Sequence, residues 1–171
     1  MTRLLVWLSR LHRCGGFGIQ SPTDYAFDRE VISESLPYYS YKLLDKTAAS
    51  RLQRKTGRLC LRLANWRQPA LMPHNDYEPW CQAGCRRTRF CDMPEVIEMA
   101  VADICETERI SEIIRRCNDA SLLVADRIYK NRTLWNNICQ KQQVTVTFDL
   151  YYCGIALFDT KRYKTNYIIN F

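Results

Sequence analysis

Ser121-Leu122-Leu123-Val124-Ala125-Asp126 is the stretch of this sequence that decides the fold. A short, continuous apolar run is typical of a strand that is buried on both faces of a parallel sheet. Further along the chain, Val144–Leu150 alternates apolar and polar residues, which predicts a strand with one covered face. On this interpretation Asp149 lies on the polar face, as a surface residue. Gly154–Phe158 and Tyr167–Phe171 are two more predicted strands.

Toward the N-terminus the pattern becomes helical. Residues 1–66 are expected to form a helical segment, in which Ser21 and Pro22 begin one helix and Thr47–Trp66 forms a longer amphipathic one. Glu106–Cys117 predicts a further amphipathic helix beside the apolar strand. We therefore expect an α/β protein, with an N-terminal helical cap at 1–66 and an α/β core at 67–171 in one compact domain.

Length, composition and charge exclude several classes of protein. The chain has 171 residues, 47% of them hydrophobic and 25% charged, so a disordered or low-complexity chain is excluded. No apolar run is long enough to cross a membrane or to serve as a signal peptide, and the expected location is the cytoplasm. The nine cysteines are expected to be reduced and mostly structural.

Two groups of residues are considered as binding sites, one for a metal ion and one for nucleic acid. His74, Cys81, Cys85 and Cys91 include a single close pair of zinc-type ligands, whereas zinc sites normally have two, so no metal site is predicted. The net charge is +7, and near the C-terminus three tyrosines lie among cations: Tyr151, Tyr152, Lys161, Arg162, Tyr163 and Lys164. Such a mixture either stacks bases and holds phosphates or protects the edge of a hairpin from further pairing.

Four segments carry a resemblance to a known family. The tail, Val144–Asp159 followed by Tyr167–Phe171, resembles the C-terminus of a class I S-adenosylmethionine-dependent methyltransferase-like family of Bacteroides and relatives. Gly16-Phe-Gly-Ile-Gln-Ser-Pro-Thr-Asp-Tyr-Ala-Phe27 resembles the family's N-terminal His-Gly-Ile-His-Ser-Pro-type signature, and Gly57–Pro69 resembles the helix before its first strand. The resemblance implies a Rossmann-like, mostly parallel sheet with an antiparallel C-terminal hairpin, here with a reduced number of strands.

The resemblance also implies site residues. Asp126 matches the first residue of the family's Asp-Asp-Ile-type turn and would contact the S-adenosylmethionine cofactor, while Ser21 and Tyr25 would face an unidentified acceptor substrate. The sequence departs from the family in two places. Arg127 replaces the second acidic residue, and Ala70–Trp80 contains no glycine where the cofactor needs a close backbone approach.

Two functions follow from these observations. The chain is either an active methyltransferase or a degenerate member that keeps the scaffold without efficient catalysis, and the missing glycine turn favours the second. The alternative is a basic module that binds nucleic acid or protein on a structural α/β scaffold. We expect Leu71–Trp80 to fill the cofactor space with Tyr77 and Trp80, and so to prevent tight binding of S-adenosylmethionine.

Overall fold

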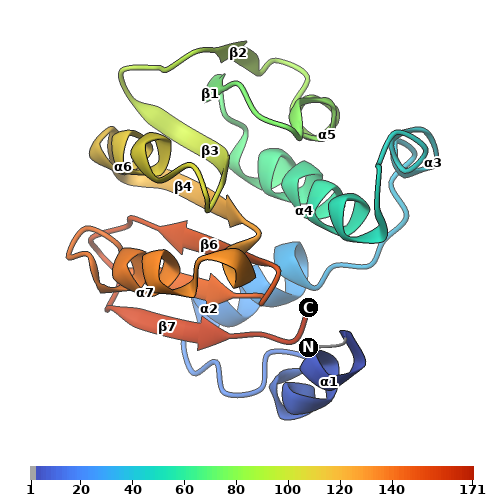
Figure 1. Cartoon of the computed structure of the whole chain (residues 1–171), viewed down its shortest axis with the longest axis vertical. Coiled ribbons are helices and arrows are strands. Elements are labelled where there is room, and N and C mark those ends of the chain that lie inside the picture. Colours follow the sequence, from blue (N-terminus) through green and yellow to red (C-terminus); the bar gives the residue numbers. More distant parts are fainter. Residues whose placement is uncertain (1–2) are drawn as a thin grey trace.

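The computed structural model describes residues 3–171 as a mixed α/β fold (Figure 1). Its strands are β1 (Leu71–Pro73), β2 (Arg89–Cys91), β3 (Ile97–Asp103), β4 (Cys117–Asp126), β5 (Val146–Asp149), β6 (Cys153–Leu157) and β7 (Thr165–Ile168). Its α-helices are α1 (Arg3–Ser9), α2 (Pro22–Phe27), α3 (Tyr41–Leu44), α4 (Arg51–Arg67), α5 (Glu78–Gly84), α6 (Thr107–Arg115) and α7 (Arg132–Gln140). Short 3₁₀ turns at Leu11–Arg13 and Ile128–Lys130 and a π-helical turn at Asp28–Ile32 complete the elements.

The main sheet has five strands in the order β3-β4-β6-β5-β7. β3 and β4 are parallel, as are β5 and β7, whereas β6 is antiparallel to both of its neighbours, β4 and β5. The sheet is therefore mixed rather than mostly parallel, because β6 returns directly from β5 through residues 150–152. β1 and β2 form a separate parallel pair, and β1 lies beside β3.

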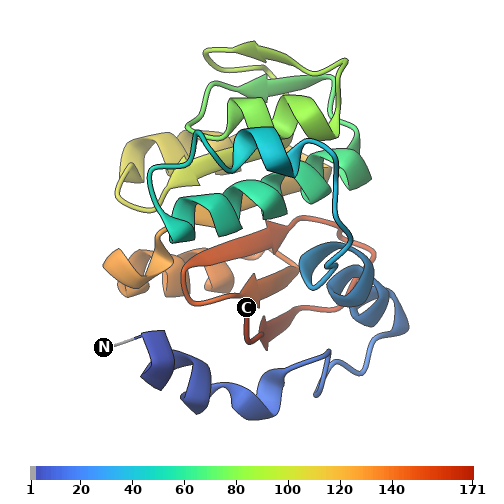
Figure 2. The same ribbon diagram turned by 90° about the vertical axis from the view of Figure 1, so that its right-hand side faces the viewer.

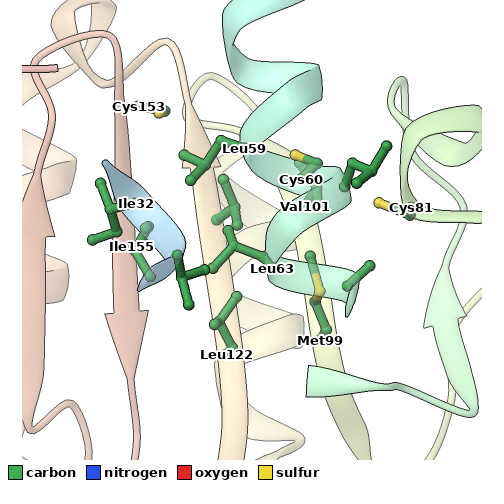
Figure 3. Packing of buried hydrophobic residues seen from close by; sticks show 14 of the residues in the cluster. Ile32, Leu59, Cys60, Leu63, Cys81, Met99, Val101, Leu122, Cys153 and Ile155 are labelled. Atoms are coloured by element: carbon green, nitrogen blue, oxygen red, sulfur yellow. The ribbon is translucent and has the colours of Figure 1, made fainter. Parts of the chain in front are cut away.

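Helices cover both faces of the sheet, and each face has its own hydrophobic core. On one face α4 buries Leu59 and Leu63 against β3, β4 and β6, as Figure 3 shows. On the other face α6 and α7 bury Ile113 and Trp135. Figure 2 shows α4 and α5 on one side of the strands and α6 and α7 on the other. Each residue of the apolar run 122–125 is therefore buried in one of the two cores. This is why apolar and polar residues do not alternate in the run.

The prediction of one covered face for β5 is wrong. All four of its residues are buried, because β5 lies between β6 and β7 and has a helix on each side. Phe148 contacts the Phe27 ring of α2 on one face, with 5.3 Å between ring centroids. On the other face Asp149 accepts a hydrogen bond from Arg132 of α7. The polar residues at alternate positions therefore mark internal hydrogen bonds, not a solvated face.

The expected helical segment over residues 1–66 is present in the described part, from residue 3 on, interrupted by irregular stretches at 14–21, 33–40 and 45–50. The predicted helix Thr47–Trp66 therefore begins at Arg51, and residues 1 and 2 lie outside the described residues. The predicted helix start at Ser21 is correct, because Ser21 Oγ accepts a hydrogen bond from the Asp24 amide at the start of α2. Outside this segment, the Asn131 side chain accepts a hydrogen bond from the Leu134 amide at the start of α7. The predicted helix Glu106–Cys117 ends at Arg115, since Cys117 already pairs with Ile97 as part of β4.

Candidate functional site

Asp126 ends β4 at the edge where the parallel strands β3 and β4 both terminate. The register places Asp103, the last residue of β3, directly beside it. This is the edge at which open α/β sheets usually bind ligands. The Asp126 side chain is buried, and its Oδ2 accepts a 2.7 Å hydrogen bond from the hydroxyl of Tyr77, which lies just before α5.

The environment of Asp126 disfavours its charge. Burial raises the pKa of its carboxyl group above the ordinary value, and the hydrogen bond from Tyr77 and the neighbouring Arg127 offset only part of that effect. The pKa of the Tyr77 phenol is raised for the same first reason, burial, and then by the Asp126 charge. Tyr77 therefore stays protonated at every physiological pH, and its hydroxyl is the donor of the bond to Asp126 Oδ2.

Arg127 covers the rim of this site. Its backbone has φ 58°, a left-handed conformation that is uncommon for a residue with a side chain. The guanidinium forms an ion pair with Asp103 and lies 3.7 Å from Asp126 Oδ2. Arg127 thus turns back over the two strand ends, where its single positive charge lies beside both acidic side chains.

The chain before α5 leaves little free space beside Asp126. The loop amides are already bonded within the loop: the Tyr77 amide donates to Asn75 Oδ1, and the Asn75 amide donates to Glu78. Tyr77 lines the space beside Asp126, whereas Trp80 is buried against Gly57 of α4 and does not line that space. The remaining cavity beside Asp126 measures about 30 Å³, room for about one or two water molecules.

The two residues expected to face a substrate lie elsewhere. Asp24, one turn after Ser21, accepts hydrogen bonds from Arg162 and Tyr167. That region adjoins the start of β7, where Thr165 pairs with Val146, whereas Asp126 lies at the opposite end of the sheet. Ser21 Oγ is occupied as a helix cap, and Tyr25 is exposed. The structure therefore does not bring Ser21 and Tyr25 together with Asp126.

A buried ionic cluster at the end of β5 was missed from the sequence. Asp149, expected at the surface, is buried and accepts hydrogen bonds from Arg10 at 2.9 Å and Arg132 at 2.6 Å. Burial alone would raise the pKa of its carboxyl group, but the bond from Arg132 and the charges of both arginines hold that pKa below the ordinary value. Arg10 also donates to the carbonyl of Ile169, so the cluster ties the N-terminal segment to the end of β7.

The cations and tyrosines near the C-terminus do not form one surface. Tyr151 and Tyr152 lie in the turn between β5 and β6, at the Asp149 end of the sheet. Residues 161–164 lie in the connection between β6 and β7, at the opposite end. Eight residues, 153–160, separate the two groups in sequence, and the length of β6 separates them in space.

The zinc-type side chains considered in the sequence analysis have separate surroundings. Cys81 and Cys85 are buried, and His74 is bonded to Glu78. Within residues 3–171, no group of three or more histidine, cysteine or acidic side chains is arranged to hold a metal ion. In the same part of the chain, no helix is both long enough and apolar enough to cross a membrane.

Comparisons with protein families, with curated proteins and with solved structures give no match to this chain.

Proposed function

We propose that this chain is a methyltransferase-like protein that does not catalyse methyl transfer efficiently, because its own side chains close the S-adenosylmethionine site. The observation that carries the proposal is the cavity of about 30 Å³ beside Asp126. Sites for small molecules are usually about 300–1,000 Å³. The four segments that resemble the family support the scaffold, and so do a sheet covered by helices on both faces and the antiparallel pairing of β5 with β6.

Opening this site would disrupt several favourable contacts at once. The ligand would have to displace the Tyr77 hydroxyl from Asp126 and the Arg127 guanidinium from Asp103. In return, Asp126 offers one polar contact, worth about 1 kcal/mol net. Micromolar binding requires about 8 kcal/mol. The balance therefore favours the closed site.

The nucleic-acid alternative has weaker support, since the residues that suggested it are divided. Tyr151 and Tyr152 lie at one end of the sheet, whereas Tyr163 lies with Lys161, Arg162 and Lys164 at the other. A continuous track for a strand of nucleic acid needs the stacking residues and the cations side by side.

Calorimetric titration with S-adenosylmethionine and S-adenosylhomocysteine tests the proposal. We expect no saturable heat at ligand concentrations up to about 1 mM, where only about 4 kcal/mol of binding free energy would suffice. Asp126→Asn and the matched exposed control Asp92→Asn should behave like the parent protein. A dissociation constant in the low micromolar range that Asp126→Asn abolishes and Asp92→Asn preserves would show an open, functional cofactor site.

A further inference from the structure

A second, larger hollow lies on the other side of the Arg10–Asp149 cluster. Its volume is about 350 Å³, within the range of small-molecule sites. Its walls come from α1, the first turns of α4, the turn between β5 and β6, and the last two residues. Figure 1 shows the chain end next to α1, and Asn170 hydrogen-bonds to backbone carbonyls of Trp7 and Arg13. We call this hollow the α1–α4 cavity.

Two cations of the α1–α4 cavity have no counter-charge. Arg51 and Lys55 lie one turn apart on α4, and neither forms an ion pair with any described residue. The first turn of α4 contains no acidic residue, although the positive end of a helix normally favours one. Arg10, in contrast, is already committed to Asp149. The cavity therefore presents unbalanced positive charge at one end.

Aromatic rings form much of the remaining wall. Trp7, Tyr151, Tyr152 and Phe171 line the cavity, and the Lys55 ammonium lies 4.3 Å from the centroid of the Phe171 ring. Although the Lys55 side chain is exposed overall, desolvation around this ammonium lowers its pKa. Trp7 is 48% exposed, which leaves a ring face available to a ligand.

Tyr151 is held in its place at a conformational cost. Its φ is 70°, in the left-handed region that residues with a side chain seldom adopt. The Tyr151 amide donates to Asp149 Oδ1 at 2.8 Å, and the Arg10 guanidinium lies 5.3 Å from the centroid of its ring. The buried cluster thus fixes the orientation of a tyrosine in the cavity wall, and strain of this kind is concentrated at ligand-binding positions.

We infer that the α1–α4 cavity binds a small ligand that combines a flat aromatic group with a phosphate, the chemistry of a nucleoside monophosphate. The phosphate would pair with Arg51 and Lys55 at the start of α4, and the aromatic group would stack on Trp7 or on the tyrosines. An uncharged aromatic compound would leave the two cations unbalanced, and inorganic phosphate would leave the aromatic wall unused. The site shares no lining residue with the closed cavity beside Asp126.

Calorimetric titration with adenosine 5′-monophosphate tests this inference, with adenosine and inorganic phosphate as partial ligands. We expect the nucleotide to bind with a dissociation constant below about 1 mM, more tightly than either partial ligand and more weakly as salt is added. Arg51→Gln combined with Lys55→Gln should weaken binding at least about tenfold, since hydrogen bonds to charged groups are worth that much or more. Trp7→Ala should weaken it about tenfold through lost stacking.

Arg54→Gln is the matched control, because it removes a cation from the same turn of α4 outside the cavity lining. It should leave the affinity within about twofold of the parent value, a change below the size of one exposed ion pair. The inference is overturned if the nucleotide does not bind, if the double variant binds as well as the parent, or if inorganic phosphate binds equally well. Tighter binding of a short single-stranded oligonucleotide than of the mononucleotide would overturn it in favour of a nucleic-acid surface.

Discussion

Replacing Asp149 by asparagine keeps the size of the side chain and removes the only carboxylate that both Arg10 and Arg132 contact. The two arginines respond differently. The Arg10 side chain is 11% exposed, so it stays buried without a counter-charge, although it retains the carbonyls of Asp149 and Ile169 as acceptors. Arg132 is 39% exposed and turns toward water at little cost.

The expected loss of stability follows from that difference. Removing one partner of a buried ion pair costs about 3–5 kcal/mol. Because only Arg10 remains buried and because it keeps two acceptors, we expect Asp149→Asn to lower the free energy of unfolding by about 2–3 kcal/mol at pH 7. Glu106→Gln, which removes the 44%-exposed partner of Arg109, should cost less than about 1 kcal/mol and serves as the control.

The pH dependence gives a second, independent check. The folded-state pKa of Asp149 lies below the unfolded value of about 3.9, so its contribution is complete above that pH and is lost as pH falls through the folded pKa. Urea unfolding followed by tryptophan fluorescence at pH 7 and at progressively lower pH measures both quantities. A loss below about 0.5 kcal/mol at pH 7, or a difference from the parent that grows as pH falls, would refute this account of the cluster.

Three further predictions concern single contacts, each measured by urea unfolding. Gly154→Ala places a Cβ against the Trp135 ring in the core between β6 and α7. We expect this overpacking to lower the free energy of unfolding by about 1–3 kcal/mol. An unchanged urea midpoint would contradict the close packing of Gly154 on Trp135. Tyr77→Phe removes the hydroxyl that donates to Asp126 and should lower the free energy of unfolding by about 1–3 kcal/mol at pH 7. Because protonation of Asp126 removes the charge that the hydroxyl stabilised, this loss should become smaller at pH 5. A loss that increases on acidification would contradict the role given to this hydrogen bond. Asn131→Ala removes the side-chain cap of α7 and should cost about 1 kcal/mol, so a gain in stability would refute the capping role.

Much of the strand content could be predicted from the sequence, because it depends on local patterns. The run at 122–125 predicted a buried strand, and Asp126 was correctly placed at its end. The absence of glycine before α5 predicted that Tyr77 would occupy the space beside Asp126. Each of these inferences used only residues that are close together in the sequence and the size and shape of their side chains.

The burial of Asp149 could not be predicted in the same way. An acidic residue at an alternate position of a strand indicates a solvated face unless its partners are known. Arg10, the partner that buries it, lies 139 residues away in the sequence, and no local pattern connects the two. The parallel pairing of β7 with β5 is equally non-local, and it places β5 between two strands in the interior of the sheet.

The contacts of Arg10 with Asp149 and Ile169 also have a consequence for the order of folding. They join residues that are 139 and 159 positions apart, nearly the full length of the chain. Closing so large a loop carries a high entropic cost, which is recovered only after the sheet that supplies both acceptors has formed. During synthesis on the ribosome, the N-terminal segment therefore waits for the last strand to emerge, with its apolar side chains accessible to chaperones until then.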